Sequence, residues 1–347
     1  MNDSKRIEYI DAMRGFTMLL VVAHHVAAFC LGIGDYVPSI HPVLCEFRMP
    51  LFFFISGFVL YKEETIWNAS YATKFLFVMK FSAQIITTSI FFFVFLIINH
   101  IGVMEGLYTD SKLGYWFTLS LYLFFCVYAI CRYVLYLIHC KSIYTDIIIL
   151  SVGALFFLLF YVPSVFSKLP IENDIKDLLS MEKWGYFLFF TIGTLFRKHF
   201  NMVQTILDKT PVLMICLVIF FGFNLYYVEL RATHINLLEL TTALTGIVIV
   251  FSFFRIHQDL FKKDRFVGRC LQYVGRRTLD IYLLHYLLLP VNLKMYFTSL
   301  AEHPIPIIEL TITLIIMLII VAGCLVISRI LRMSPTLAYL LFGVRKR

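Results

Sequence analysis

Apolar runs of about 20 residues recur along the whole chain, and they constrain its fold more than any other feature. A helix of that length crosses the hydrocarbon core of a bilayer, since each helical residue advances about 1.5 Å. Of the 347 residues, 60% are apolar and 15% are charged, which fits a lipid-embedded chain better than two soluble domains. We therefore expect an all-α integral membrane protein.

Ten transmembrane spans are predicted, of which the sixth is the shortest. The first apolar run lacks a small-residue cleavage site, so we expect it to stay as a span and not to be removed as a signal peptide. The sequence contains no internal repeat and no low-complexity linker, which favours a single membrane-embedded domain over residues 1–347 with no appended soluble domain. The predicted spans are 15–33, 44–61, 75–99, 114–138, 146–162, 184–197, 211–229, 236–254, 279–297 and 307–331.

The distribution of Lys and Arg predicts the orientation of these spans. With the N-terminus inside, the cytoplasmic ends and loops hold 23 of the 30 basic residues and the outer ones hold 7, so both termini are expected in the cytoplasm. The largest share lies between Arg255 and Arg277, and this bias accounts for the net charge of +8. Nucleic-acid binding is disfavoured, because no soluble segment shows zinc-finger spacing or interleaved aromatic and basic residues. The eight cysteines include no C-x-x-C pair, and no metal site is predicted.

The first span, "DAMRGFTMLLVVAHHV", carries ionisable groups, each of which costs on the order of 3 kcal/mol in a bilayer and is therefore a candidate for function. Eleven residues separate Arg14 from His25, close to three helical turns, so the two lie on one helix face about 16 Å apart while His24 faces elsewhere. A neutral imidazole at the depth of His25 can take a proton from a hydroxyl, which is the task of a general base. The alternative is equally supported by the pattern: Arg14 anchors the helix at the interface and His25 bonds a neighbouring helix.

The second stretch, "FRMPLFFFISGFVL", contributes two weaker candidates. Arg48 stands at the outer edge of its span and is a candidate for the acceptor side, although an interfacial arginine equally often extends its charge toward the headgroups. Ser56 is a candidate pocket residue. A serine next to a glycine such as Gly57 more often mediates close helix packing, and no nucleophile and base pair is recognisable around it.

The third stretch, "GRRTLDIYLLH", opens the ninth span. Thr278, Tyr282 and His285 follow at i, i+4 and i+7 and line one helix face, with His285 roughly 10 Å from the cytoplasmic surface. A structural histidine bonded to a carbonyl is at least as well supported as a pocket residue. Arg276 and Arg277 could hold the phosphates of a donor, although the general excess of basic residues inside is the default explanation for them.

Taken together and in this order, "RIEYIDAMRGFTMLLVVAHH", "FRMPLFFFISGFVL" and "GRRTLDIYLLH" resemble the membrane-bound acyltransferase family 3. The resemblance implies a multi-pass protein of the bacterial plasma (inner) membrane that moves acyl groups, most often acetyl from acetyl-coenzyme A, onto hydroxyls of cell-surface glycans. It also implies that Arg14 and His25 are the functional pair, because the family has an arginine followed by a histidine eleven positions later. Where members often show a serine-tyrosine pair, this chain has Thr278-Leu279, so a hydroxyl role there rests on Thr278.

The expected function is therefore that of an O-acyltransferase, with an acyl-coenzyme A as donor substrate, a glycan or its precursor as acceptor and no permanently bound cofactor. The alternative is a transporter of glycans or lipid-linked intermediates, in which Arg14, Arg48 and His285 line a polar pathway. The sequence shows no inverted repeat and no paired broken helices, which disfavours the transporter. It predicts neither the acyl group nor the acceptor sugar, and it leaves the oligomeric state unknown.

Overall fold

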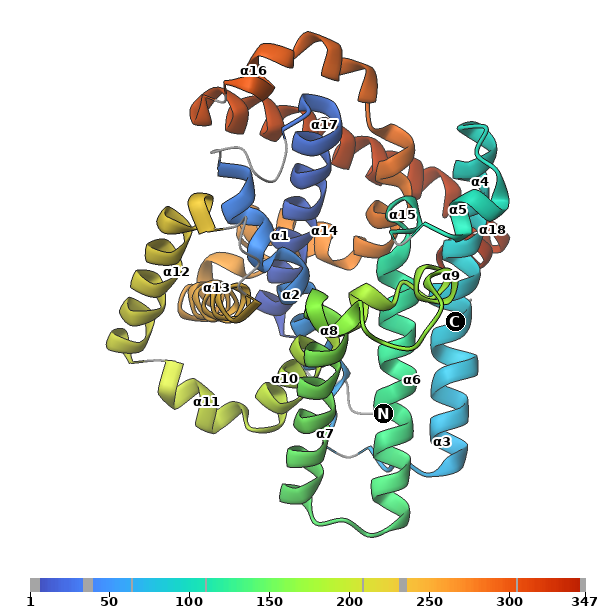
Figure 1. Ribbon diagram of the computed structural model, residues 1–347, viewed down its shortest axis with the longest axis vertical. Coiled ribbons are helices and arrows are strands. Elements are labelled where there is room, and N and C mark those ends of the chain that lie inside the picture. The colour runs from blue at the N-terminus through green and yellow to red at the C-terminus, as the bar shows by residue number, and fades with distance from the viewer. Residues whose placement is uncertain are drawn as a thin grey trace. The chain divides into compact units, whose positions relative to one another are not determined.

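The computed structural model describes residues 7–33, 40–63, 65–109, 111–207, 209–230, 236–303 and 305–343 (Figure 1). Within these ranges every regular element is a helix, which confirms the prediction of an all-α fold for the described part of the chain. The first six and the last four residues lie outside it, so the predicted cytoplasmic position of the two termini stays a prediction.

Six helical segments in the described residues are long and apolar enough to cross a membrane, and a seventh is added if the bent pair Phe200–Leu207 and Thr210–Asn224 forms one span. Each of them coincides with a span expected from the sequence. The protein is therefore a multi-pass membrane protein. The six segments are Glu8–Leu31, Ala69–Ile98, Trp116–Leu137, Ser142–Tyr161, Leu237–Ile256 and Pro306–Leu331.

The other three predicted spans are not among these segments, so the count of ten stays a prediction. The helix α2 (Ile40–Leu60) has 21 residues and covers most of the predicted span 44–61, and α10 (Phe187–Lys198) follows a 3₁₀ segment. The predicted span 279–297 is not one helix, because α15 (Thr278–Leu288) ends at an extended Leu289 and is followed by Pro290, which disfavours helical geometry in the residue before it. A helix of 11 residues is about 16 Å long, too short for a core of about 30 Å.

The chain divides into two compact units, each built from two separate stretches of sequence. The first unit comprises residues 1–55 and 199–328, and the second comprises residues 56–198 and 329–347. The prediction of a single membrane domain over the whole chain stays a prediction.

The first unit contains the first and third of the sequence stretches singled out above. Its main helices are α1 (Glu8–His25), α13 (Asn236–Ile256), α14 (Phe266–Arg276), α15 and α17 (Pro306–Leu331) (Figure 1). A π-helical segment, η1 (Val26–Leu31), continues α1 directly after His25. The remaining elements of this unit are the first part of α2, α11 (Phe200–Leu207), α12 (Thr210–Leu230), η7 (Gln258–Phe261), η8 (Val291–Tyr296) and α16 (Thr298–Glu302).

The second unit is held together by aromatic side chains. Phe190 of α10 lies 5.7 Å from Phe125 and 5.8 Å from Tyr128 of α6 (Trp116–Leu137), measured between ring centroids, and is fully buried. Phe187 lies 5.1 Å from Phe156 of α7 (Ser142–Phe156). The remaining elements are α3 (Ala69–Thr73), η2 (Lys74–Ile86), α4 (Thr87–Ile98), α5 (Val103–Leu107), η3 (Lys112–Gly114), η4 (Phe157–Tyr161), α8 (Pro163–Phe166), α9 (Asn173–Leu178), η5 (Met181–Tyr186) and α18 (Pro335–Phe342).

Candidate active site

Two glycines bring α1 and α14 into backbone contact. A Cβ atom added at Gly15 would collide with the carbonyl oxygen of Leu271, and one added at Gly275 would collide with the carbonyl oxygen of Asp11. Small residues at a helix crossing permit this close approach, which membrane helices use to pack. The crossing fixes Arg14, next to Gly15, against the start of α15, three residues beyond Gly275.

Arg14 bonds across this crossing to α15. Its Nη2 donates a hydrogen bond to Oγ1 of Thr278 at 3.3 Å, and Thr278 is buried at the first position of the helix. The sequence pattern placed both residues among the candidates but gave no reason to pair them. The bond holds one edge of the guanidinium group, which has five N–H donors in all.

A second set of polar contacts joins α1 and α15 farther along the two helices. Nδ1 of His25 is 2.9 Å from Nε2 of His285, and the hydroxyl of Tyr286 is 2.9 Å from Nε2 of His25. Both nitrogens of the His25 ring therefore have a partner on α15. Nδ1 of His285 is in turn 3.0 Å from the carbonyl oxygen of Ile281, one turn earlier in its own helix.

Ring stacking restricts the orientation of the His25 side chain. The His25 and His285 rings have centroids 5.0 Å apart and are inclined by only 17°, while Phe29 stacks on His25 at 5.8 Å and 27°. Phe29 belongs to the π-helical segment η1, and π-helical turns are frequent at functional sites. His285 is completely buried, whereas His25 is half-buried.

A buried carboxylate anchors the beginning of α15. Oδ2 of Asp280 accepts a hydrogen bond from the hydroxyl of Ser328 on α17, and Nη1 of Arg277 lies 3.4 Å from the same oxygen. Asp280 is 2% exposed and Arg277 is partly exposed. A buried carboxylate is tolerated when it is paired and hydrogen-bonded, as it is here. The ion pair holds Arg277 at the base of α15 and ties this helix to α17.

The family model for the acyltransferase domain of acyltransferase family 3 matches residues 7–329. The chain belongs to this family. The match includes every residue of the Arg14–Thr278 and His25–His285–Tyr286 contacts. The protein is thus a multi-pass membrane acyltransferase. Comparison with curated proteins gave no match, and comparison with solved structures gave none either.

Five of the candidate site residues predicted from the sequence lie on the facing helices α1 and α15. Besides Arg14, His25, Thr278 and His285, these include Tyr282, which is buried and has its ring centroid 6.1 Å from that of His285. The structure thus brings together the first and the third sequence stretch. Their catalytic roles stay predictions.

The remaining predicted candidates are placed differently. Nε of Arg276 donates to the carbonyl oxygen of Gln272 in its own helix, and its side chain is exposed, while Arg277 pairs with Asp280. Arg48 has a half-buried side chain on α2, and Ser56 belongs to the second unit, so the roles assigned to these two residues stay predictions.

Two residues of the site were missed in the sequence. Tyr286 follows His285 directly and stands four residues after Tyr282, a helical spacing that brings it close to the same face. Asp280 carried a different signal, a carboxylate in the first turn of an otherwise apolar helix. Among the described residues, no group of three or more His, Cys, Asp or Glu side chains could hold a metal ion.

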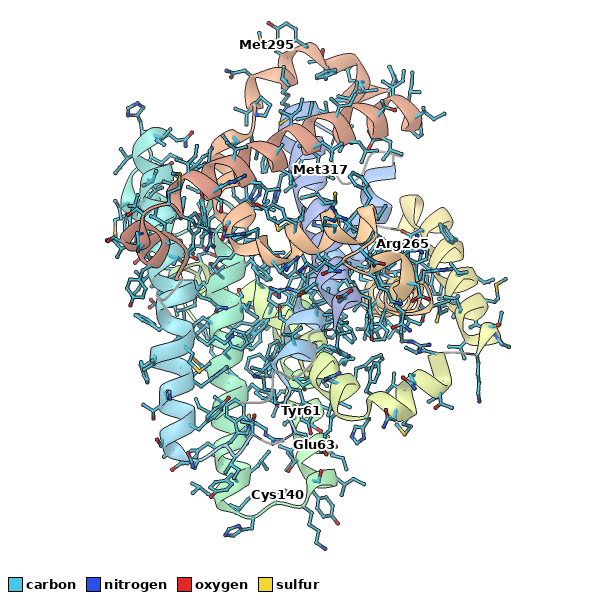
Figure 2. The ribbon with its side chains drawn as sticks, turned by 180° about the vertical axis from the view of Figure 1, so that it is seen from behind. Tyr61, Glu63, Cys140, Arg265, Met295 and Met317 are labelled. Carbon is cyan, nitrogen blue, oxygen red and sulfur yellow. The ribbon has the colours of Figure 1, made fainter. Side chains whose placement is uncertain are left out.

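The basic segment before α15 is fastened to α1. The backbone N–H of Lys263 donates to Oε2 of Glu8 at 3.0 Å, and the side chain of Gln272 donates to the carbonyl oxygen of Phe261 at 2.7 Å. Arg265 precedes the first turn of α14 and is exposed (Figure 2). An exposed set of cations therefore lies near the Arg14 end of α1. The exposed members are Lys262, Lys263, Arg265, Arg269 and Arg276.

Proposed function

We propose that this acyltransferase moves an acetyl group from acetyl-coenzyme A, or another acyl group from its coenzyme A thioester, to a hydroxyl of a bacterial cell-surface glycan or its precursor, with His25 as the general base. The observation that carries the proposal is the 2.9 Å contact between Nε2 of His25 and a hydroxyl group, that of Tyr286. A base must lie within hydrogen-bond reach of the proton it removes, and the imidazole meets this condition for a hydroxyl at this position.

The reaction then balances as a direct transfer. Nε2 of His25 takes the proton of the acceptor hydroxyl while its oxygen attacks the thioester carbonyl carbon. The C–S bond breaks, the ester forms, and the imidazolium returns its proton to the sulfur of coenzyme A. General-base assistance of this kind is typically worth about 10²–10⁴-fold in rate.

Arg14 is proposed to bind the donor. It lies about three helical turns from His25, and the pantetheine arm of coenzyme A is extended enough to carry the thioester from one to the other. Its hydrogen bond to Thr278 orients the guanidinium group, whose planar set of donors suits a phosphate or the thioester region. The exposed cations of the segment before α15, with Arg276 and Arg277, are proposed to attract the nucleotide phosphates.

Two assays test the proposed reaction. Purified protein in lipid bilayers should release coenzyme A from labelled acetyl-coenzyme A when supplied with envelope glycan from a strain that lacks the gene. Mass spectrometry of that glycan should show the loss of one acyl group relative to the parent strain, restored by the wild-type gene and not by His25→Ala. Unchanged glycan in the deletion strain, together with no turnover of acetyl-coenzyme A, would refute an acetyl transfer to this acceptor class.

We further propose ten spans in the plasma membrane, the ninth of them interrupted after Leu288, with both termini in the cytoplasm, based on the distribution of basic residues. The native Cys270 is exposed on α14 and serves as the inner probe, and an exposed position in the loop before α9, Ser167→Cys, serves as the outer probe. In a background with the other cysteines replaced, a membrane-impermeant thiol reagent should label Cys270 only after lysis and the Ser167→Cys variant in intact cells. The opposite labelling contradicts this orientation.

A further inference from the structure

The hydrogen bonds around His25 and His285 form a chain whose direction is set at one end. Nδ1 of His285 lies 3.0 Å from the carbonyl oxygen of Ile281. A carbonyl oxygen only accepts hydrogen bonds, so this nitrogen must carry a hydrogen and donate it. In a neutral imidazole one nitrogen is a donor and the other an acceptor, which leaves Nε2 of His285 as an acceptor.

The tautomer of His285 determines the tautomer of His25. Its Nδ1 is 2.9 Å from Nε2 of His285 and must be the donor of that bond, since two acceptors cannot bond each other. In a neutral His25 ring, Nε2 then has a lone pair and no hydrogen. The hydroxyl of Tyr286, 2.9 Å away, is the donor to this nitrogen. Every bond of the chain has one direction only, from the Tyr286 hydroxyl to His25, to His285 and to the Ile281 carbonyl.

We propose that His285 is a positioning residue that holds His25 in the tautomer with a proton on Nδ1, so that Nε2 is the basic nitrogen facing a hydroxyl group. The catalytic consequence of this inference rests on the proposed function, in which Nε2 removes the proton of the acceptor. The structural part does not, because a tautomer can be measured in the resting protein.

The same contact serves after proton transfer. When Nε2 of His25 has taken the proton, Nδ1–H of the imidazolium still donates to the neutral Nε2 of His285, and a hydrogen bond from an ionised donor is stronger than one between neutral groups. The parallel rings, 5.0 Å apart and inclined by 17°, keep the two nitrogens aligned throughout. In catalytic triads a third group, often a carboxylate, orients the histidine base. Here the neutral ring of His285 would orient His25 in the same way.

A cationic His285 would reverse the bonds that involve His25, while Nδ1 of His285 would still donate to the Ile281 carbonyl. Both of its nitrogens would then donate, Nδ1 of His25 would accept, and Nε2 of a neutral His25 would carry a hydrogen and could not act as a base. The complete burial of the His285 side chain argues against this arrangement, because a buried charge is costly. The two arrangements predict opposite tautomers for His25.

Nuclear magnetic resonance distinguishes the tautomers directly. The protein is labelled with ¹³C,¹⁵N-histidine in lipid bilayers, and the His25 ring is identified among the ten histidines by its absence in His25→Gln. We expect Nδ1 of His25 to be protonated and Nε2 to be unprotonated. In His285→Leu, which removes the acceptor, we expect the His25 signals to shift toward the Nε2–H form, while the His24 signals keep their positions. Protonation of Nε2 in the wild-type protein, or an unchanged His25 ring in His285→Leu, overturns the inference.

Kinetics with two substitutions test the catalytic consequence. His285→Gln keeps a carbonyl oxygen that can accept from Nδ1–H of His25, whereas His285→Leu does not. Because hydrogen-bond partners that orient metal-bound histidines typically contribute about 10–100-fold, we expect by analogy that His285→Leu lowers kcat for acetyl-coenzyme A turnover by about that factor, with KM for acetyl-coenzyme A within about twofold of wild type. His285→Gln should recover most of the loss, which a simple packing role of His285 does not predict.

The outcomes separate the inference from the proposed function. If His25→Ala has wild-type activity, His25 is not the base and the proposed function fails, whatever the tautomer. If His25→Ala is inactive but His285→Leu and His285→Gln are equally slow, or neither is slow, the positioning role fails and the base assignment stands. Thermal unfolding of both His285 variants verifies that they are folded at the assay temperature.

Discussion

The two units of this acyltransferase differ in the polar side chains that join their helices. In the first unit, Arg14 bonds Thr278 and His25 bonds His285 and Tyr286, so each pair joins two different helices. In the second unit, the buried hydroxyls of Thr191 and Thr194 donate to carbonyl oxygens three residues earlier in their own helix, at 2.8 and 2.7 Å. A hydroxyl satisfied in this way needs no neighbour and makes few demands on packing.

The second unit joins helices through the hydroxyls of Thr88 and Thr118, which are 2.7 Å apart, and through the ion pair of Lys198 on α10 with Asp146 on α7 at 2.5 Å. Its core is otherwise dominated by aromatic rings around Phe190. The comparison indicates that the first unit brings two imidazole rings and a phenol into contact, as expected of a reactive site, while the contacts between helices in the second unit include a hydroxyl pair, an ion pair and aromatic packing. Substitutions in the two units should therefore have separable effects.

The largest effect is expected for His25→Ala. Loss of a general base should lower the rate of acyl transfer by about 10²–10⁴-fold at equal expression and folding. The matched control is His24→Ala, which removes the adjacent ring, 5.1 Å from that of His25, and should change the rate far less. Assays of both purified variants with acetyl-coenzyme A make the comparison, and His25→Ala activity within a few fold of wild type would return His25 to a packing role.

Phe190→Ala should have a large effect on stability and little effect on the rate of acyl transfer. Truncation of this fully buried ring leaves a cavity among Phe125, Tyr128 and Phe187, and we expect it to lower the free energy of unfolding by about 3 kcal/mol. The rate per folded molecule should stay near that of the wild type. Denaturant titration in detergent measures the free energy of unfolding, and turnover normalised to folded protein measures the rate. A kcat as low as that of His25→Ala would contradict the separate roles of the two units.

A smaller effect, about tenfold, is expected for Arg14→Lys. Lysine keeps the charge but loses the planar set of donors that bonds Thr278 and is proposed to grip the donor, so KM for acetyl-coenzyme A should rise more than kcat falls. Arg276→Lys is the control, because Arg276 is exposed and bonds a carbonyl of its own helix. Equal KM values for Arg14→Lys and Arg276→Lys would remove Arg14 from the donor site.

The smallest effect is expected for Tyr286→Phe. In a direct transfer the acceptor hydroxyl replaces the Tyr286 hydroxyl at Nε2 of His25, so loss of the latter should change kcat by less than about fivefold, since a net hydrogen bond is worth about 1 kcal/mol. Complete loss of activity would instead indicate that Tyr286 carries the acyl group covalently. A labelled acyl-tyrosine in the wild-type protein incubated without acceptor would establish that mechanism.

Much of this site could be predicted from the sequence, because it depends on helical periodicity. The spacing of Arg14 and His25 gave one face of α1, and Thr278, Tyr282 and His285 gave one face of α15. Periodicity within a helix does not say which helices face each other. The contact of α1 with α14 and α15 depends on Gly15 and Gly275, whose role appears only when both backbones are present.

Other features depend on local geometry that hydropathy does not report. Hydropathy does not distinguish an apolar stretch that forms one long helix from one that is interrupted. The end of α15 at Leu288 was therefore not predicted, although the sequence contains Pro290. Tyr286 was missed for a related reason. An aromatic residue in a membrane helix is ordinary, and only its hydroxyl contact with His25 distinguishes it.

The central claim is that His25 and His285 act as one unit, and a double-mutant cycle tests it most directly. Acetyl transfer is measured for His25→Ala, His285→Leu and the double variant, each purified in lipid bilayers and normalised to folded protein. If His285 acts only by orienting His25, substituting His285 should not change the rate of acetyl transfer in a protein that already lacks the His25 ring. The double variant should then have the same rate as His25→Ala. A double variant whose loss equals the product of the two single losses would show independent roles and contradict the account.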